Sequence, residues 1–233
     1  MSGVRARRLR VLLRHVGDDT EGALLGADAE RALLSSGAVA AATGELAQLK
    51  AEYDANGFVV LRRFLGGAQL AEARREADVC ISAGEKQPKW LGIKKGLERE
   101  SAYFEAQLLR GAHLPLLSAL IEDEPSAAGA GVFDKLRGKS FPVAPHSDSG
   151  GARNGATLWI SLDRADSTNG SISYLRGSHR RSAKIENADG VAKSADPFSM
   201  LDSFEEGWGE GEIFSMVAEP GDAVIHSSKT LHW

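Results

Sequence analysis

The stretch FPVAPHSDSG, residues 141–150, contains a histidine and an aspartate two positions apart. Two prolines precede the pair, and a serine–glycine turn follows it. In an extended chain, residues i and i+2 project from the same face, so the imidazole of His146 and the carboxylate of Asp148 would point to one side. Such a pair fits either part of a metal site or a polar loop, because a metal needs a third ligand from elsewhere in the chain.

The sequence around this stretch has the pattern of an antiparallel β-rich unit. After about residue 130, short runs such as GVFDKL, ATLWISLD, SISYLRGS, EIFSMVAE and DAVIHS alternate with turns rich in Gly, Asn, Asp and Pro. An Asn-Gly pair between two strand-like runs, in DSTNGSISY, is a strong hairpin signal. We therefore predict an α+β fold in which N-terminal helices flank a mainly β core, either a β-sandwich or a jelly roll (double-stranded β-helix).

Helical patterns precede the β-rich half. GELAQLKAEYDANG predicts a helix that ends at a glycine, FVVLRRFL a strand, and GGAQLAEARREADVCISAGEK a second helix. Residues 98–123 predict a helix in two pieces, broken around GAHLP. Residues 1–44 have the composition of a basic, alanine-rich and partly helical extension, so we expect the jelly-roll domain with its helical support to span residues 45–233. The polar segment 182–210 predicts a lid or a binding loop.

Composition narrows the classes of function. The chain has 233 residues, of which 42% are hydrophobic and 26% charged, with a net charge of −4 and a pI near 5.9. This balance is typical of a globular protein and argues against nucleic acid as a partner. The single cysteine, Cys80, excludes an internal disulfide and suits a reducing compartment. No apolar run approaches the ~20 residues of a membrane span. The arginine-rich start fits either an organelle transit peptide or the basic start of a helix, so we expect a cytoplasmic protein, with organelle targeting as the alternative.

The C-terminal stretch EPGDAVIHSSKTLHW contains two candidates for the third ligand, His226 and His232. Either histidine would complete a set of two histidines and one carboxylate with His146 and Asp148. This set occupies one face of an octahedral metal and leaves the other positions open, which is the arrangement of non-haem Fe(II) oxygenases. Spacing alone does not decide which of the two histidines is the third ligand.

Three motifs in order resemble the phytanoyl-CoA dioxygenase family of Fe(II)/2-oxoglutarate-dependent oxygenases. They are PHSD, then TLWISLDRADSTNGSISYLRGSH, then PGDAVIHSSKTLHW, and YDANGFVVLRRFL resembles the opening segment of that family. The resemblance covers about residues 48–233. It implies a jelly-roll fold, an Fe(II) centre, 2-oxoglutarate and O₂ as co-substrates, and hydroxylation of a small organic or acyl substrate.

The resemblance also implies roles for single residues. The iron ligands are expected to be His146, Asp148 and His232, because the family uses the second histidine of its last motif. His226 is then expected to support the site or to pack in the core.

Three further side chains are expected at the co-substrate: Trp159, Ser147 and Lys94, with Lys95 as the alternative lysine. The family also places an arginine about ten residues past the distal histidine, where it binds the far carboxylate of 2-oxoglutarate. This chain stops at Trp233, one residue after His232. We therefore expect a fragment that lacks the arginine and the last strand of the jelly roll.

Two other functions compete with a hydroxylase. A non-catalytic jelly-roll binding protein that retains a metal is the alternative, and the missing arginine supports it. A halogenase of the same fold is disfavoured by Asp148, because those enzymes replace the carboxylate with a small residue. The expected partner is a small-molecule substrate, whose identity the sequence does not give, and the oligomeric state is open.

Overall fold

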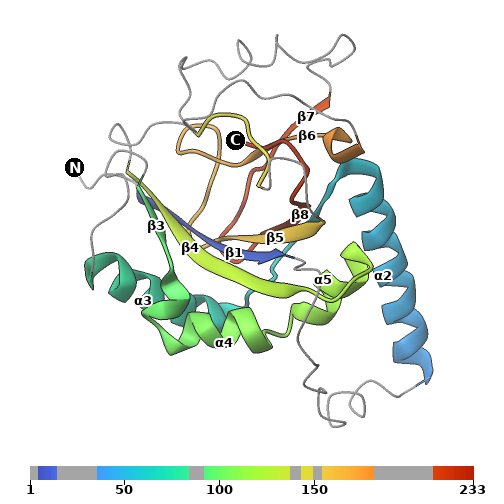
Figure 1. The fold of residues 1–233 in the computed structure, drawn as a ribbon, viewed down its shortest axis with the longest axis horizontal. Coiled ribbons are helices and arrows are strands. Elements are labelled where there is room, and N and C mark those ends of the chain that lie inside the picture. Colours follow the sequence, from blue (N-terminus) through green and yellow to red (C-terminus); the bar gives the residue numbers. More distant parts are fainter. Residues whose placement is uncertain (1–4, 15–35, 84–91, 137–142, 149–153, 181–211) are drawn as a thin grey trace.

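The computed structural model describes residues 5–14, 36–83, 92–136, 143–148, 154–180 and 212–233, with the backbone alone for residues 5–14, 36–43 and 136. Figure 1 shows a twisted sheet with helices packed under one face and shorter strands over the other. The helices are α2 (Ser36–Asn56), α3 (Gly67–Ala83), α4 (Ala102–Arg110) and α5 (Leu114–Ile121), with short 3₁₀ turns η1 (Leu97–Arg99) and η2 (Ser178–Arg180). The strands are β1 (Arg5–Arg14), β2 (Phe58–Leu61), β3 (Ile93–Lys95), β4 (Ser126–Leu136), β5 (Gly155–Ser161), β6 (Ser173–Leu175), β7 (Ile213–Ser215) and β8 (Ala223–Ser227).

Two antiparallel layers form the β core. The larger sheet has the strand order β2-β8-β5-β1-β4-β3, and each of its pairs is antiparallel. The smaller layer contains β6 and β7, and single bridges from His232 to His146 and to Tyr174 extend it. The chain thus crosses from β5 in the larger sheet to β6 and β7 in the smaller layer and returns to the larger sheet at β8, as in a jelly roll. The predicted α+β fold with a mainly β core is confirmed.

Strand β1 differs from the partly helical extension that we expected for residues 1–44. It lies in the middle of the larger sheet, paired with β4 on one side and with β5 on the other. Leucine and arginine both favour helices, so the composition of this segment suggested a helix. The edges of β4 and β5 offer hydrogen-bond partners to the ten backbone residues of β1 on both sides. This tertiary pairing overrides the weak intrinsic preference of the segment for a helix. The domain boundary at residue 44 stays a prediction.

The alternation of side chains along β5 divides the core into two parts. Leu158 and Ile160 face the helices and pack in a cluster with residues of α3, α4 and α5. Trp159 faces the smaller layer, where it packs in a second cluster that includes Phe58 and Tyr174. A buried side chain of this size contributes about 1.5–3 kcal/mol. Because Trp159 and Thr157 share a face, β5 carries residues of the second cluster and of the candidate site on one side.

The turn before β8 is tied down by a buried carboxylate. Asp222 accepts hydrogen bonds from Nη1 of Arg62 at 2.7 Å, from the backbone N–H of Arg63 at 2.8 Å and from the backbone N–H of Glu219 at 3.1 Å. Burial by itself would raise the pKa of Asp222, but these hydrogen bonds and the Arg62 charge outweigh it and lower the pKa. The contact fixes where β8 begins and therefore which of its residues face the second layer.

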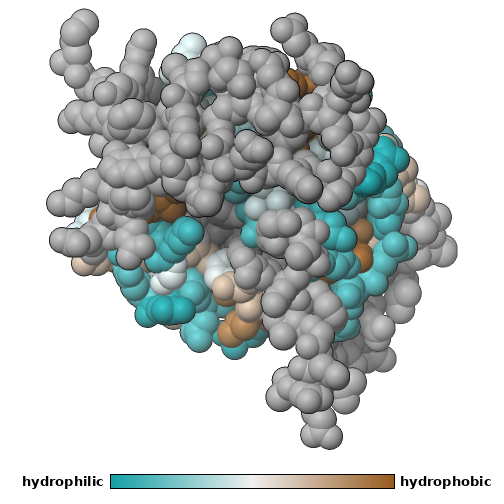
Figure 2. Space-filling view, turned by 45° about the horizontal axis from the view of Figure 1, so that its top comes forward, coloured by the Kyte–Doolittle hydropathy of each residue, from teal (hydrophilic) through white to brown (hydrophobic). Residues whose placement is uncertain are grey.

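The described surface is largely hydrophilic on the face seen in Figure 2, with small hydrophobic areas between polar residues. The exposed large hydrophobic side chains of the described residues are Leu46, Val79, Leu109 and Val217, which lie in separate segments of the chain. Scattered single apolar residues are normal on a protein surface. None of the helices in the described ranges is both long enough and apolar enough to cross a bilayer.

Candidate metal centre

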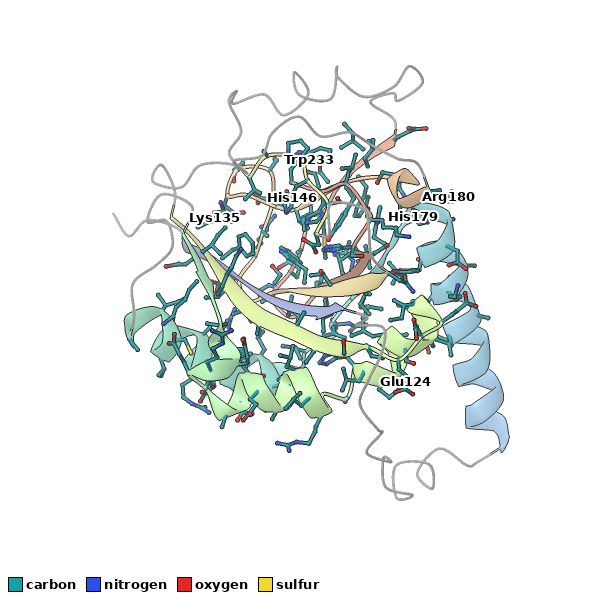
Figure 3. All side chains as sticks on the ribbon, viewed as in Figure 1. Glu124, Lys135, His146, His179, Arg180 and Trp233 are labelled. Atoms are coloured by element: carbon teal, nitrogen blue, oxygen red, sulfur yellow. The ribbon has the colours of Figure 1, made fainter. Side chains whose placement is uncertain are left out.

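His146, Asp148 and His232 come together on the inner side of the smaller layer. Each offers one ligand atom, and these atoms all lie within 4.8 Å of one another. The Nε2 atoms of His146 and His232 lie 3.9 Å and 3.6 Å from Oδ1 of Asp148. In Figure 3, His146 lies on the opposite side of the sheet from α3 and α4, close to the C-terminal Trp233. The predicted set is therefore assembled from two segments far apart in the sequence.

Backbone hydrogen bonds hold these two segments together. The N–H of His146 donates to the carbonyl of His232 at 2.9 Å, and the N–H of His232 donates back to the carbonyl of His146 at 2.9 Å. The N–H of Asp148 donates to the carbonyl of Ser228 at 2.9 Å. This pairing explains why the i, i+2 spacing works. As antiparallel bridge partners, His146 and His232 place their side chains on one face, and Asp148, two residues after His146, shares that face.

Each ligand histidine has one ring nitrogen occupied by the protein. Nδ1 of His146 lies 2.9 Å from the carbonyl oxygen of Ala144, and Nδ1 of His232 lies 3.0 Å from the carbonyl oxygen of Thr230. A carbonyl oxygen only accepts, so each Nδ1 carries the hydrogen and donates. In the neutral imidazole, Nε2 then carries the lone pair, and it faces Asp148, as a metal ligand requires.

The three candidate ligands differ in how deeply they are buried. The side chains of Asp148 and His232 are only 2% and 5% exposed, whereas that of His146 is 30% exposed. A buried carboxylate is costly unless a cation or hydrogen bonds compensate it. The geometry therefore suits a divalent cation held deep on the Asp148 side, with access from the His146 side.

His226, the other candidate for the third ligand, has a different position. Its Nε2 lies 3.2 Å from Oδ2 of Asp148, the oxygen that does not face the other two histidines. Its Nδ1 lies 2.9 Å from the hydroxyl of Tyr174. His226 belongs to the continuously buried strand β8, and His232 follows the turn after it. The group of three convergent ligand atoms contains His232 and leaves His226 beside it.

Two residues that contact the site were missed by sequence reasoning. Thr157 donates from Oγ1 to Oδ2 of Asp148 at 2.5 Å, and Tyr174 holds His226. The signal for Thr157 was present, because it precedes Trp159 by two residues and so shares its face of β5. Tyr174 offered no comparable signal, since its contact depends on how the two layers face each other.

The side chains that were predicted at the co-substrate have mixed positions. Trp159 is buried on the same face of β5 as Thr157, and Ser147 lies half-buried between the two ligands. Their role in co-substrate binding stays a prediction. The structure does not bring Lys94 to the site: its ammonium group donates to the carbonyl of Cys80 in α3 and pairs with Glu100 at 2.5 Å, on the helical side. Lys95 is exposed.

The reason for the position of Lys94 is its register. It lies opposite Val132 of β4, and antiparallel partners share a face of the sheet. Val132 packs in the core cluster beneath the sheet. The predicted loop 182–210 lies outside the described residues, and the expected lack of the family's arginine stays a prediction.

The fold and the convergent residues define a class of protein. It is a jelly roll that carries two histidines and one carboxylate, the ligand set of non-haem Fe(II) oxygenases. Residues 126–233 match the sequence profile of the family described as Phytanoyl-CoA dioxygenase (PhyH). The resemblance found in the sequence is thus confirmed by the match of this part of the chain to the PhyH family. No curated protein sequence shows significant similarity to the chain.

Solved structures resemble the fold over most of the chain. The epimerase SnoN, solved with Fe³⁺, alpha ketoglutarate and nogalamycin RO, matches with a TM-score of 0.61 at 17% identity over 82% of this chain and 77% of its own. EctD from S. alaskensis, solved with 2-oxoglutarate and 5-hydroxyectoine, gives a TM-score of 0.61 at 16% identity over 80% and 68%. EvdO2 from Micromonospora carbonacea var. aurantiaca, solved with 2-oxoglutarate, gives 0.57 at 18% identity over 79% and 82%. At these identities the likeness establishes the fold.

Proposed function

We propose that this protein is an Fe(II)/2-oxoglutarate-dependent dioxygenase that hydroxylates a small organic or acyl substrate. The observation that carries the proposal is the convergence of His146, Asp148 and His232, with all three ligand atoms within 4.8 Å of one another. The two Nε2 lone pairs and the buried carboxylate fit a divalent iron. The match to the PhyH family and the similar structures solved with iron or 2-oxoglutarate support the same cofactor and co-substrate.

When bound, Fe(II) together with 2-oxoglutarate supplies the oxidising chemistry that inserts an oxygen atom from O₂ into a C–H bond. The chain contributes two neutral nitrogens and one negative carboxylate, so the ligand set carries a single negative charge. The bridge between His146 and His232 fixes the spacing of the two nitrogens. The exposed side of His146 leaves a route by which small molecules reach the open positions.

Release of succinate tests the proposed function. The protein with Fe(II), 2-oxoglutarate and O₂ should form succinate slowly even without the substrate, and Asp148→Ala should abolish this turnover. Asp54→Ala is the control, because Asp54 lies on the exposed surface of α2. Metal binding with no succinate, and no visible absorption band when 2-oxoglutarate is added anaerobically to the Fe(II) protein, would instead favour the non-catalytic binding protein.

A further inference from the structure

The two oxygens of Asp148 have different surroundings. Oδ1 faces the Nε2 atoms of His146 and His232 at 3.9 Å and 3.6 Å. Oδ2 accepts a hydrogen bond from Oγ1 of Thr157 at 2.5 Å and lies 3.2 Å from Nε2 of His226. The Asp148 side chain is only 2% exposed, so water competes little for either oxygen. One oxygen is thus left toward the candidate metal, and the other is bound by the protein.

The partners of His226 assign its tautomer. An ionised carboxylate only accepts hydrogen bonds, so Nε2 of His226 carries the hydrogen and donates to Asp148. Nδ1 of the neutral ring is then an acceptor, and the hydroxyl of Tyr174 donates to it at 2.9 Å. Tyr174, His226 and Thr157 are all buried, at 0%, 1% and 0% exposure. Each therefore has few alternative partners, and their hydrogen bonds form one chain that ends on Oδ2.

The chain of hydrogen bonds follows from the sheet. Thr157 of β5 and His226 of β8 are direct register partners, so their side chains stand next to each other on one face. Tyr174 comes from β6 in the opposite layer and packs against His226, with ring centroids 5.2 Å apart. Three strands from two layers thus converge on one carboxylate oxygen. A contact fixed by strand register is rigid, as positioning of a metal ligand requires.

We propose that Thr157 and His226 are positioning residues that occupy Oδ2 of Asp148 and so restrict the carboxylate to a single metal bond through Oδ1. Tyr174 holds the imidazole of His226 in the donating tautomer. This inference rests on the proposed function, since it concerns the metal of that site. A carboxylate bound through both oxygens would take an additional coordination position. Binding through Oδ1 alone leaves that position to the co-substrates.

Co(II) titrations of the whole protein test the inference, because the visible spectrum of Co(II) reports both affinity and coordination number. Thr157→Val keeps the shape of the side chain but loses the donor, and it should weaken Co(II) binding by about 10–100-fold. Its spectrum should change toward the weaker absorption of a higher coordination number. Thr157→Ser restores the hydroxyl and should recover most of the affinity and the original spectrum.

Ser161→Ala is the matched control for loss of a buried hydroxyl from the same strand. Ser161 is 0% exposed and donates to the carbonyl of Asp163 at 2.6 Å, away from Asp148. It should lose stability without any change in Co(II) affinity or spectrum. Tyr174→Phe should weaken Co(II) binding less than Thr157→Val, because His226 keeps its own bond to Asp148.

Two results would overturn the inference. The first is a Thr157→Val protein that is folded and has the affinity and the spectrum of the wild type. The second is a His226→Ala protein that loses Co(II) as completely as His146→Ala does, since His226 would then be a ligand. A wild-type protein that binds no Co(II) is a separate outcome, which contradicts the proposed function and the inference together.

Discussion

Replacing Gly57 by alanine should disturb the candidate metal centre from a distance. Gly57 joins α2 to β2 with a φ of +83°, a conformation that side chains disfavour. Its carbonyl accepts hydrogen bonds from Oγ1 of Thr230 at 2.7 Å and from the N–H of Ser227 at 2.9 Å. Thr230 in turn precedes His232 by two residues and accepts its Nδ1 hydrogen. The glycine therefore supports the segment that carries the distal ligand.

The magnitude follows from two effects. An L-residue in the left-handed region costs about 1–2 kcal/mol. A Cβ at this position would lie 2.5 Å from Nδ1 of His179 and 2.5 Å from Oγ1 of Thr230, so both side chains must shift. Such overpacking adds about 1–3 kcal/mol. Gly57→Ala should thus lower the free energy of unfolding by about 2–5 kcal/mol in total.

Gly96→Ala separates the two effects. Gly96 has a φ of +80°, close to that of Gly57, but a Cβ there would meet only Cδ of Arg99 at 3.9 Å. This control should lose only the conformational part, about 1–2 kcal/mol. Gly96 stands before η1, whose Leu97 packs in the core cluster with residues of the helices.

Urea unfolding and Co(II) titration of both variants provide the assay. Gly57→Ala should be the less stable protein. It should also bind Co(II) at least roughly tenfold more weakly than the wild type, because a shift of Thr230 displaces His232. A tenfold loss of affinity corresponds to about 1.4 kcal/mol of binding free energy. Gly96→Ala should keep the wild-type affinity. Equal losses of stability and equal affinities in the two variants would refute the reasoning.

Three further predictions concern groups outside the ligand set. Burial lowers the pKa of His113 from its ordinary 6.5 to about 4. The folded protein should therefore lose about 3 kcal/mol of stability as the pH falls from about 6.5 to about 4, because the unfolded chain binds a proton there that the buried imidazole does not. Urea unfolding across this range should show that loss in the wild type and not in His113→Gln. Asp222→Asn should lower the free energy of unfolding at pH 7 by about 1.5–3 kcal/mol. The difference in stability between this variant and the wild type should shrink at a pH below the lowered pKa of Asp222, because the wild-type carboxyl is then protonated and uncharged, like the amide. Lys94→Met should lower stability by about 1–3 kcal/mol, yet calorimetry should find an unchanged affinity for 2-oxoglutarate, because Lys94 bonds to Cys80 and Glu100 on the helical side.

Several features of this structure could be predicted from local sequence patterns. The break at GAHLP separates α4 from α5 as expected, because Pro115 sits in the first turn of α5, where its missing N–H costs nothing. The i, i+2 spacing of His146 and Asp148 predicted a shared direction, which the bridge to the strand of His232 produces. These features depend on the residues next to them in the sequence.

Features that depend on distant partners were harder to predict. Strand β1 has a composition that favours a helix, and only the open edges of β4 and β5 explain its conformation. Lys94 was expected at the co-substrate, but its pairing with Val132 turns it to the helical side. Spacing could not separate His226 from His232, since the choice depends on which oxygen of Asp148 each histidine faces.

The most direct measurement of the central claim is the position of the metal in an anaerobic crystal of the Fe(II) protein, found from anomalous scattering at the iron absorption edge. The account predicts one peak within about 2.2 Å of Nε2 of His146, Nε2 of His232 and Oδ1 of Asp148, the range that nitrogen and oxygen ligands of a divalent metal show. His226 should lie outside this range and donate to Oδ2. A peak bound through His226 in place of His232, or no peak at these residues, would contradict the account.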